Sequence, residues 1–461
     1  MRQSADTSFY APVPSSAMPG IVWPAMPGER SSSIFAVLAQ LEMSQWWSPE
    51  ALARWQLRQA TELVTYAAGS VPFYRDRLAG FQEQRSPLTM GEWRRIPLLE
   101  RDDIRKAGDS LNTCRPLQGH DASYVAHTSG STGEPISVQK NSVTQQLHAA
   151  FVLRDHFWRR RDFRGKLASV GLQGGGTMDK VKAGGTARWA LHHPSGPMVF
   201  FDLTDSVDAA LEWLAREDPD YLMTYPNYLR AMIERSEETG VKPSRLREAS
   251  TYGEIVSDAL RQQCTDSWDA RLVDIYGAEE LGFIALDCPE HDHYLVQSEN
   301  VLVEILDDDD RPCGPGEVGR VVVTSLHNFS TPLIRYSIGD YAEVGPPCAS
   351  GRGLPVIQRI HGRVRNMLTA PSGGRVWPAL NHSGLDKLEP LRQFQLLQTA
   401  DLAIRLRMVV DRPLTPAEET QARHAMVNAL GPDFEVHLDY VDSIPRSPSG
   451  KLEDIISEVA H

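Results

Sequence analysis

The sequence predicts an α/β protein with a large N-terminal domain of β-sheets flanked by helices and a small α+β C-terminal domain. Three observations support this fold class. The middle of the chain alternates short apolar runs with helical stretches, the segment from Val301 is rich in β-branched residues, and the last hundred residues form a separate strand–helix–strand pattern. The length of 461 residues allows about three structural units of ~150 residues each.

The N-terminal segment predicts an irregular arm followed by helices. Residues 1–30 are rich in Pro, Ser and Ala, a composition that favours an irregular or partly disordered chain. From Ile34 to Leu78, apolar residues recur at spacings of three and four, as on one face of a helix. Ser48-Pro49-Glu50 supplies an N-cap serine and a proline at the first helical position.

The central region predicts strands alternating with helices. Apolar runs at 167–170, 198–201, 221–224 and 272–275 are expected strands, and the segments 209–216, 227–239 and 257–267 are expected helices. This alternation is typical of largely parallel sheets. Further strands are expected at 301–306 and 318–325, with a polar turn at 308–316 between them.

The C-terminal hundred residues predict a separate small domain. Alternating apolar residues at 402–410 and 434–440 indicate two strands, and Thr415-Pro416-Ala417-Glu418 has the spacing of a capping box that starts a helix ending near Gly431. We therefore divide the chain into a proline-rich arm (1–30), a large domain (31–362) and a C-terminal domain (363–461).

Composition excludes several classes of protein. The 47 Lys and Arg against 60 Asp and Glu give a net charge of −13, which argues against a nucleic-acid partner. No apolar run reaches the ~18–20 residues of a membrane span, and the N-terminus lacks the pattern of a signal peptide. Five scattered cysteines, an odd number, argue against a disulfide framework. We expect a reduced, cytoplasmic protein; monomer and homodimer both remain open.

The strongest local motif is a loop rich in hydroxyl groups and glycine, Thr128-Ser129-Gly130-Ser131-Thr132-Gly133-Glu134-Pro135. Its glycines allow successive backbone N–H groups to converge, and its hydroxyls add donors, which together suit a phosphate chain. No Gly-Lys-Ser/Thr follows, so the motif is not a Walker A loop. Taken alone, the segment also fits an ordinary surface turn.

Three further residues favour nucleotide chemistry over that ordinary interpretation. Glu279 directly follows the apolar run 272–275, where a carboxylate can hold Mg²⁺ against phosphates. Asp340 follows Gly339 in what we expect to be a tight turn, and it can accept both hydroxyls of a ribose. Lys451 lies in a Pro- and Gly-rich loop near the C-terminus. Each has a simpler explanation as a solvated or turn residue.

In this order, the motifs resemble those of the adenylate-forming superfamily, which includes acyl- and aryl-CoA synthetases, adenylation domains of peptide synthetases, and luciferases. The resemblance runs from about Val71 to Leu452 and includes Tyr276-Gly-Ala-Glu279, Arg359…Gly362-Arg363 and Pro448-Ser-Gly-Lys451. The segments Val71-Pro-Phe-Tyr-Arg75 and Thr251-Tyr-Gly-Glu254 are most similar to the phenylacetate–CoA ligase branch.

The resemblance implies a two-step reaction. A small carboxylic acid, by the habit of this branch aromatic, attacks the α-phosphate of ATP to give an acyl-adenylate and pyrophosphate, and coenzyme A then displaces AMP. It implies ATP and Mg²⁺ as cofactors and a mobile C-terminal domain that rotates between the two steps.

The resemblance also assigns roles to residues. Thr128 and the loop residues Ser129, Gly130, Ser131, Thr132 and Gly133 would bind the β- and γ-phosphates, and Glu279 would hold Mg²⁺. Lys451 would bridge the carboxylate and the α-phosphate. The remaining nucleotide contacts would come from Tyr252, Gly253, Glu254, Tyr276, Asp340 and Arg359, and the wall of the acid pocket from Gln173, Gly174, Tyr225 and Ala278.

The sequence departs from the family pattern at two places. The expected hinge residue is Arg365, where the family usually has Asp or Lys, which puts the details of the rotation in question. Relatives carry a structural zinc on Cys and His; here Cys288, His291, His293 and Cys348 are present, but one expected Cys is Ser350. A closed zinc site needs four ligands, so both a zinc site and an ordinary loop remain open.

The acceptor and the activated group also remain open. Relatives transfer acyl groups to coenzyme A, to a carrier protein or to an amine, and the fold could activate nitrite for attack by an arylamine. A protein of another class, a nucleotide-binding relic without catalysis, is disfavoured because Lys451 and Glu279 are both present.

Overall fold

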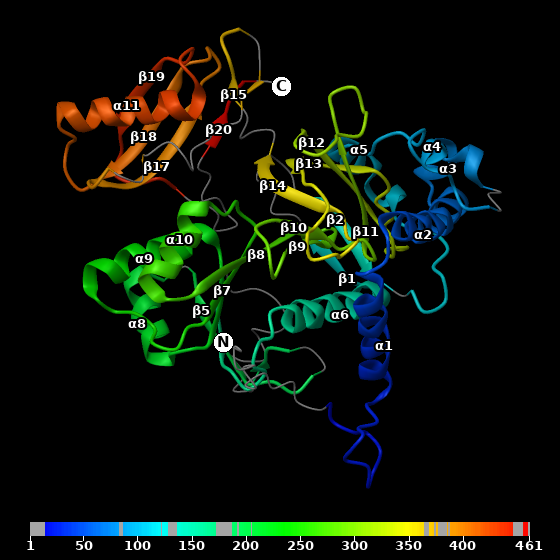
Figure 1. Cartoon of the computed structure of the whole chain (residues 1–461). Coiled ribbons are helices and arrows are strands. Elements are labelled where there is room, and N and C mark those ends of the chain that lie inside the picture. Colours follow the sequence, from blue (N-terminus) through cyan, green and yellow to red (C-terminus); the bar gives the residue numbers. More distant parts are fainter. Residues whose placement is uncertain are drawn as a thin grey trace.

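The computed structural model consists of one large domain and one small C-terminal domain (Figure 1). It describes residues 14–82, 86–120, 122–127, 136–171, 187–190, 193–203, 205–363, 368–372, 375–376, 385, 388–445 and 455–459. The predicted α/β fold class is confirmed, with a large sheet, flanking helices and a separate α+β unit.

The N-terminal part is helical from Glu29. Helices α1 (Glu29–Ser44) and α2 (Pro49–Ser70) are followed by short turns of helix, and Ser48 caps α2 by accepting a hydrogen bond from the Ala51 N–H at 3.3 Å. The short elements are α3 (Tyr74–Arg77), η1 (Ala79–Phe81), α4 (Met90–Trp93), α5 (Arg101–Ala107) and η2 (Gly108–Leu111). The cap predicted at Ser48 is therefore confirmed.

A twelve-stranded mixed sheet forms the centre of the large domain. Its order is β11-β12-β13-β14-β10-β9-β8-β7-β6-β3-β5-β4, and the run from β8 to β5 is parallel. The parallel strands are β3 (Leu167–Gly171), β5 (Pro197–Asp202), β6 (Tyr221–Thr224), β7 (Glu248–Tyr252) and β8 (Arg271–Ala278). The others are β4 (Ala187–Arg188), β9 (Gly282–Asp287), β10 (Tyr294–Val296), β11 (Val301–Leu306), β12 (Val318–Ser325), β13 (Tyr336–Val344) and β14 (Val356–Arg363). All six strands expected in this domain are present.

Helices α8 (Val207–Glu217), α9 (Pro226–Thr239) and α10 (Asp258–Trp268) connect the parallel strands, as predicted. A separate two-stranded ribbon, β1 (Ala122–His127) and β2 (Ser137–Asn141), leads into helix α6 (Ser142–Trp158). Among the described residues, no helix is long and apolar enough to cross a membrane.

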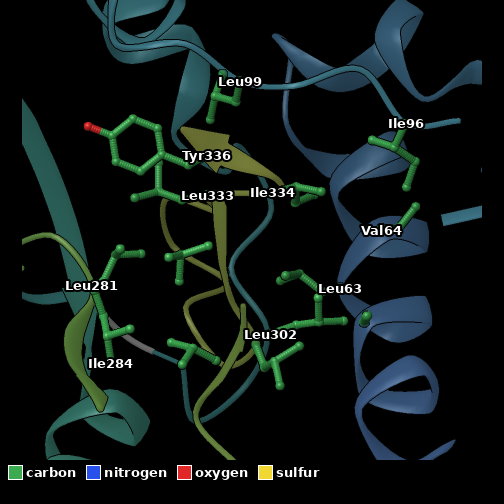
Figure 2. Packing of buried hydrophobic residues seen from close by; sticks show 14 of the residues in the cluster. Leu63, Val64, Ile96, Leu99, Leu281, Ile284, Leu302, Leu333, Ile334 and Tyr336 are labelled. Carbon is green, nitrogen blue, oxygen red and sulfur yellow. The ribbon is translucent and has the colours of Figure 1, made fainter. Parts of the chain in front are cut away.

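Four hydrophobic clusters are buried in the described part of the large domain, and two of them are the largest. Figure 2 shows the first, in which Leu63 and Val64 of α2 pack toward Leu302 of β11 and Ile334, which lies just before β13. The second lies under the parallel half, between the sheet and helices α8 to α10, and includes Leu211, Met232 and Leu260. Each half of the sheet thus has its own helical cover.

The C-terminal domain packs one helix on a four-stranded sheet of order β19-β18-β17-β20. Its elements are β17 (Leu391–Gln398), β18 (Ile404–Val410), α11 (Pro416–Leu430), β19 (Val436–Tyr440) and β20 (Ile455–Ser457); a short pair, β15 (Leu368–Thr369) and β16 (Arg375–Val376), precedes them. The capping box at Thr415 and Glu418 is confirmed. The strand expected from residue 402 begins at Ile404, because Leu402 lies in a turn with φ of 69°.

The first core yields a test of the packing. Leu63→Ala removes a fully buried side chain and should lower the free energy of unfolding by about 2–5 kcal/mol. Glu62→Ala, at the neighbouring exposed position of the same helix, is the matched control. Urea unfolding followed by circular dichroism checks both. Equal midpoints for the two variants would contradict the assignment of this core.

Candidate active site

The candidate site lies where three parallel strands end. Tyr225 follows β6, Tyr252 ends β7, and Ala278 ends β8, so side chains from three segments meet at one edge of the sheet. The carboxyl ends of parallel strands are where open α/β sheets bind ligands. The expectation that these residues share one site agrees with this geometry.

Two tyrosine rings form one wall of this edge. The rings of Tyr225 and Tyr252 lie 4.9 Å apart, centre to centre. A Cβ atom on Gly171, the last residue of β3, would lie 3.6 Å from the Tyr252 hydroxyl. Burial raises the pKa of Tyr225, with the negative charges of Glu254 and Glu279 adding to the rise. The same two carboxylates act on Tyr252, whose pKa is raised well above its usual range mainly by burial.

The loop after β7 is held by the carboxylate of Glu254. This carboxylate accepts a hydrogen bond at 3.0 Å from the backbone N–H of Asn227, in the first turn of α9. Gly253 has a φ of 78°, a left-handed conformation that favours glycine. The Tyr252-Gly253-Glu254 segment is therefore fixed against the end of the neighbouring strand.

The hairpin between β8 and β9 carries two adjacent carboxylates in opposite environments. Glu279 is exposed, whereas Glu280 is buried and accepts a hydrogen bond at 3.3 Å from the Tyr336 hydroxyl. Glu279 is the one predicted to hold Mg²⁺. Its negative charge adds to the rise that burial causes in the pKa values of Tyr124, Tyr225 and Tyr252, so Glu279 lies within electrostatic range of the tyrosine wall.

Sequence reasoning missed a buried lysine at this site. Lys140 of β2 is only 3% exposed, and its ammonium group donates a hydrogen bond to the backbone carbonyl of Glu280. Burial lowers the pKa of Lys140 to about 8, against the opposing pull of Glu280 and Glu279. Its position in a short strand soon after the hydroxyl–glycine loop is the one local hint in the sequence, and this position does not distinguish it from a solvated lysine.

Asp340 is brought to the site by an irregular strand. Its carboxylate accepts a hydrogen bond at 2.9 Å from the Tyr276 hydroxyl. The expected tight turn at Gly339 is wrong: β13 continues through it as a bulge, in which Gly339 has a φ of 85° and the pairing with β12 shifts register. A bulge of this kind re-aims a side chain without ending the strand.

Arg359 is not brought to Asp340 or Tyr276. It lies on β14 opposite Glu343, and its guanidinium is 3.6 Å from the carboxylate of Asp258 at the start of α10, with both side chains about half exposed. The other predicted nucleotide and substrate residues Thr128 to Gly133, Gln173, Gly174, Arg365 and Lys451 lie outside the described residues. The two flanks of the loop 128–135 are described: His127 pairs with Ser137, and their side chains are hydrogen-bonded at 3.0 Å.

Three of the four predicted zinc ligands converge near the start of α2, where Cys288 and Cys348 lie in one hydrophobic cluster with Leu52. The ligand atoms of Cys288, His293 and Cys348 all lie within 4.8 Å of one another. The two sulfur atoms are 3.9 Å apart, close to the roughly 3.8 Å expected for two thiolates on one tetrahedral zinc. The Nε2 atom of His293 is buried without a hydrogen-bond partner. The donor set therefore fits a zinc ion.

Ser350 and His291 lie beside this group. The Ser350 hydroxyl lies 3.0 Å from the sulfur of Cys348 and accepts a hydrogen bond from Arg352 at 3.1 Å. His291 stacks on His293 with the ring centres 5.7 Å apart, but it is not part of the three-residue cluster. Of the two predicted histidine ligands, His293 therefore lies in the cluster and His291 does not.

Comparison with protein families matches both domains. Residues 82–331 match the AMP-binding enzyme family, and residues 368–458 match the CapK C-terminal domain. Among curated proteins, the chain is 24% identical over 370 residues to the phenylacetate-coenzyme A ligase of Pseudomonas putida, covering 77% of this chain and 80% of that protein. It is also 24% identical over 422 residues to the phenylacetate-coenzyme A ligase of Escherichia coli K12, covering 86% and 90%.

Solved structures of one ligase, 2-hydroxyisobutyryl-CoA ligase, share the fold in different states. In the postadenylation state with 2-HIB-AMP, the TM-score is 0.71 at 20% identity, covering 87% of this chain and 89% of that one. In the thioesterification state with 2-HIB-AMP and CoA, the TM-score is 0.57 at 20% identity, covering 88% and 89%. An open conformation gives 0.58 at 21% identity, covering 87% and 90%.

More than half of the chain thus matches a single family model, and the fold and the ordered motifs agree with it. The chain belongs to the family of AMP-binding enzymes and is an AMP-forming acid–thiol ligase of the adenylate-forming superfamily.

Proposed function

We propose that this enzyme adenylates a small aromatic carboxylic acid and transfers the acyl group to coenzyme A. One observation carries the proposal: Tyr252, Tyr276 and Asp340, expected nucleotide residues from separate segments, lie at one edge of the sheet. The Tyr276–Asp340 hydrogen bond joins β8 to β13, and the charge of Glu279 reaches the Tyr225–Tyr252 wall.

In the first step, a carboxylate oxygen of the acid attacks the α-phosphorus of ATP. A new P–O bond forms, the bond to the β-phosphate oxygen breaks, and pyrophosphate leaves with its electron pair. Two anions must approach, and negative charge grows on the phosphoryl oxygens, so cationic groups and N–H donors stabilise the transition state. Lys451 and the loop from Thr128 to Gly133 fill these roles, and Asp340 binds the ribose hydroxyls.

Glu279 would hold Mg²⁺, which would supply further positive charge to the phosphates. The hairpin that follows β8 leaves the carboxylate of Glu279 exposed at the edge where the parallel strands end. The carboxylate of the neighbouring Glu280 is buried and accepts a hydrogen bond from Tyr336, and its backbone carbonyl accepts one from Lys140.

In the second step, the thiolate of coenzyme A attacks the acyl carbonyl carbon. The C–S bond forms, the bond between carbonyl carbon and AMP oxygen breaks, and AMP leaves; the thiol proton passes to solvent. The thioester step is supported by the likeness of this chain to 2-hydroxyisobutyryl-CoA ligase solved with 2-HIB-AMP and CoA. That match covers 88% of this chain. Transfer to a carrier protein or an amine would use the same adenylate.

The aromatic character of the acid is supported by the Tyr225–Tyr252 wall and by the two similar phenylacetate-coenzyme A ligases. An aromatic ring packs favourably against tyrosine faces and edges at such distances.

We further propose that Cys288, His293 and Cys348 hold a structural zinc ion. The cluster links the turn after β9 to the segment before β14. Because β9 runs antiparallel to β8, Cys288 lies at the edge where β8 begins, opposite the edge that carries the tyrosine wall. The role of the ion would be to fix these two loops, since all three ligands are partly or fully buried.

Adenylation is tested by acid-dependent ATP–pyrophosphate exchange over a panel of aromatic and aliphatic acids. Lys451→Ala should lower the exchange rate by about 10²–10³-fold, because it removes charge stabilisation from the transition state. Lys242→Ala, an exposed lysine after α9, should leave the rate unchanged. Full exchange in Lys451→Ala would refute the role of that residue, and silence of the wild type across the panel would refute carboxylate adenylation.

The Tyr276–Asp340 hydrogen bond makes a separate prediction about nucleotide binding. Tyr276→Phe removes the hydroxyl that orients the Asp340 carboxylate, so KM for ATP should rise about three- to tenfold, the equivalent of the net free energy of one ordinary hydrogen bond, with little change in kcat. Tyr440→Phe, on the C-terminal domain, is the control. A fall in kcat at constant KM would show that the hydroxyl acts elsewhere in the reaction.

The zinc proposal predicts a stoichiometric metal. Wild-type protein should contain one zinc per chain by elemental analysis, and Cys348→Ser should lose it and unfold several degrees lower. Cys114→Ser, which changes an exposed cysteine outside the cluster, should keep both metal and stability. Wild-type protein without zinc after expression in zinc-supplemented medium would refute the site.

A further inference from the structure

An ion pair joins the two domains. Arg392 at the start of β17 lies 2.7 Å from the carboxylate of Glu238 in the last turn of α9. Arg392 also pairs with Asp411 of its own domain, which holds the guanidinium in place. Figure 1 shows the C-terminal domain standing over the end of the large domain that carries α9 and α10.

A second carboxylate of α9 lies within electrostatic range of the same arginine. Glu234 lies one turn before Glu238, and burial raises its pKa to about 7, while the positive charges of Arg230 and Arg392 oppose that rise. In return, the charges of Glu238, Asp411 and Glu234 add to the rise in the pKa of Arg392. The end of α9 therefore presents an acidic surface to one cation of the C-terminal domain.

The arrangement of the domains corresponds to one state of a related ligase. The TM-score is 0.71 against the postadenylation state of 2-hydroxyisobutyryl-CoA ligase, but 0.57 and 0.58 against its thioesterification and open states. Because these are states of one protein at nearly the same coverage, the difference reflects how the domains are placed. The Arg392–Glu238 pair belongs to the arrangement that is present around the adenylation step.

We propose that Arg392 and Glu238 are positioning residues that latch the C-terminal domain in the orientation used for adenylation. The latch must open before the domain can turn for acyl transfer. This inference rests on the proposed two-step function. The pair acts on the reaction through the placement of the C-terminal loop that carries Lys451, not by touching the substrate.

The strength of the pair suits a reversible latch. The side chains are 42% and 35% exposed, so water and salt weaken their attraction, and the equilibrium between orientations should shift only about two- to fivefold when the pair is removed. A fully buried pair would hold the domain too firmly for turnover. Because the pair is partly exposed, added salt should weaken it, and the orientation used for adenylation should then be less populated, as it is when the pair is removed.

The test measures the two half-reactions separately. Glu238→Gln and Arg392→Gln should each slow ATP–pyrophosphate exchange about two- to fivefold, while transfer from a preformed acyl-adenylate to coenzyme A is unchanged or faster. The double variant should be no slower than either single variant, because both remove the same interaction. Arg392→Lys should restore part of the exchange rate.

Asp208→Asn is the matched control. Asp208 pairs with Arg235, which also pairs with Glu238 on the surface of α9, so this variant disturbs the same surface network without changing Arg392. It should leave both half-reactions at the wild-type rate. Equal slowing of both half-reactions in Glu238→Gln, or additive losses in the double variant, would overturn the latch and indicate a general structural role.

A readout independent of activity separates failure of the latch from failure of the proposed function. Spin labels at Glu212→Cys on α8 and Val427→Cys on α11, in a background with Cys114→Ser and Cys313→Ser, report the distance between the domains. Glu238→Gln should broaden this distance distribution or add a second population, and Asp208→Asn should not. An unchanged distribution in Glu238→Gln would overturn the latch, whatever reaction the enzyme catalyses.

Discussion

The reversal of chain direction between β8 and β9 is the constraint on which the rest of the large domain depends. Up to β8 the central strands run parallel; from β9 onward they run antiparallel. The reversal requires a close approach of two backbones, because a Cβ on Gly277 would lie 2.8 Å from the carbonyl oxygen of Gly282, and Gly282 itself has a φ of 80°. The hairpin therefore places Glu279 and Glu280 at the rim where the parallel strands end, and the antiparallel half of the sheet brings Asp340 to the same rim.

Charge is used differently inside the large domain and between the domains. Arg335 is buried, pairs with Glu304 at 2.9 Å, and donates to the backbone carbonyls of Arg94 and Ile96, so it ties the antiparallel sheet to the N-terminal helices. Trp93 donates to the same glutamate at 3.0 Å. Removing one partner of such a buried pair leaves an uncompensated charge, which makes this connection rigid. The partly exposed Arg392–Glu238 pair between the domains can open without leaving a buried, uncompensated charge.

Much of the fold was predictable from the sequence because local patterns determine it. The strands at 167–171 and 221–224, the cap at Ser48 and the capping box at Thr415 all follow from short-range periodicity and hydrogen bonding. The bulge at Gly339 was not predictable, because a glycine with positive φ occurs both in turns and in strands, and only pairing with β12 distinguishes them.

The candidate site was predictable in its members but not in its contacts. Tyr276 and Asp340 were each identified from motifs, yet the hydrogen bond between them spans 64 residues and depends on strand order. Lys140 and Glu280 were missed for a related reason: they lie 140 residues apart, and neither has a local pattern that distinguishes it from a solvated charge. Burial, which only the folded chain defines, is what separates Glu280 from Glu279.

The first hydrophobic core also sets the order in which the chain can fold during synthesis. Tyr74, just after α2, donates its hydroxyl to the carbonyl of Pro332 at 3.0 Å, 258 residues later along the chain. At roughly 5–20 residues per second, a ribosome needs about 13–50 s to supply that partner. During this interval the apolar face of α2, with Leu63 and Val64, emerges without the strands that cover it in the finished protein. The nascent chain, rather than the mature enzyme, is therefore the form in which this sequence is most exposed to aggregation.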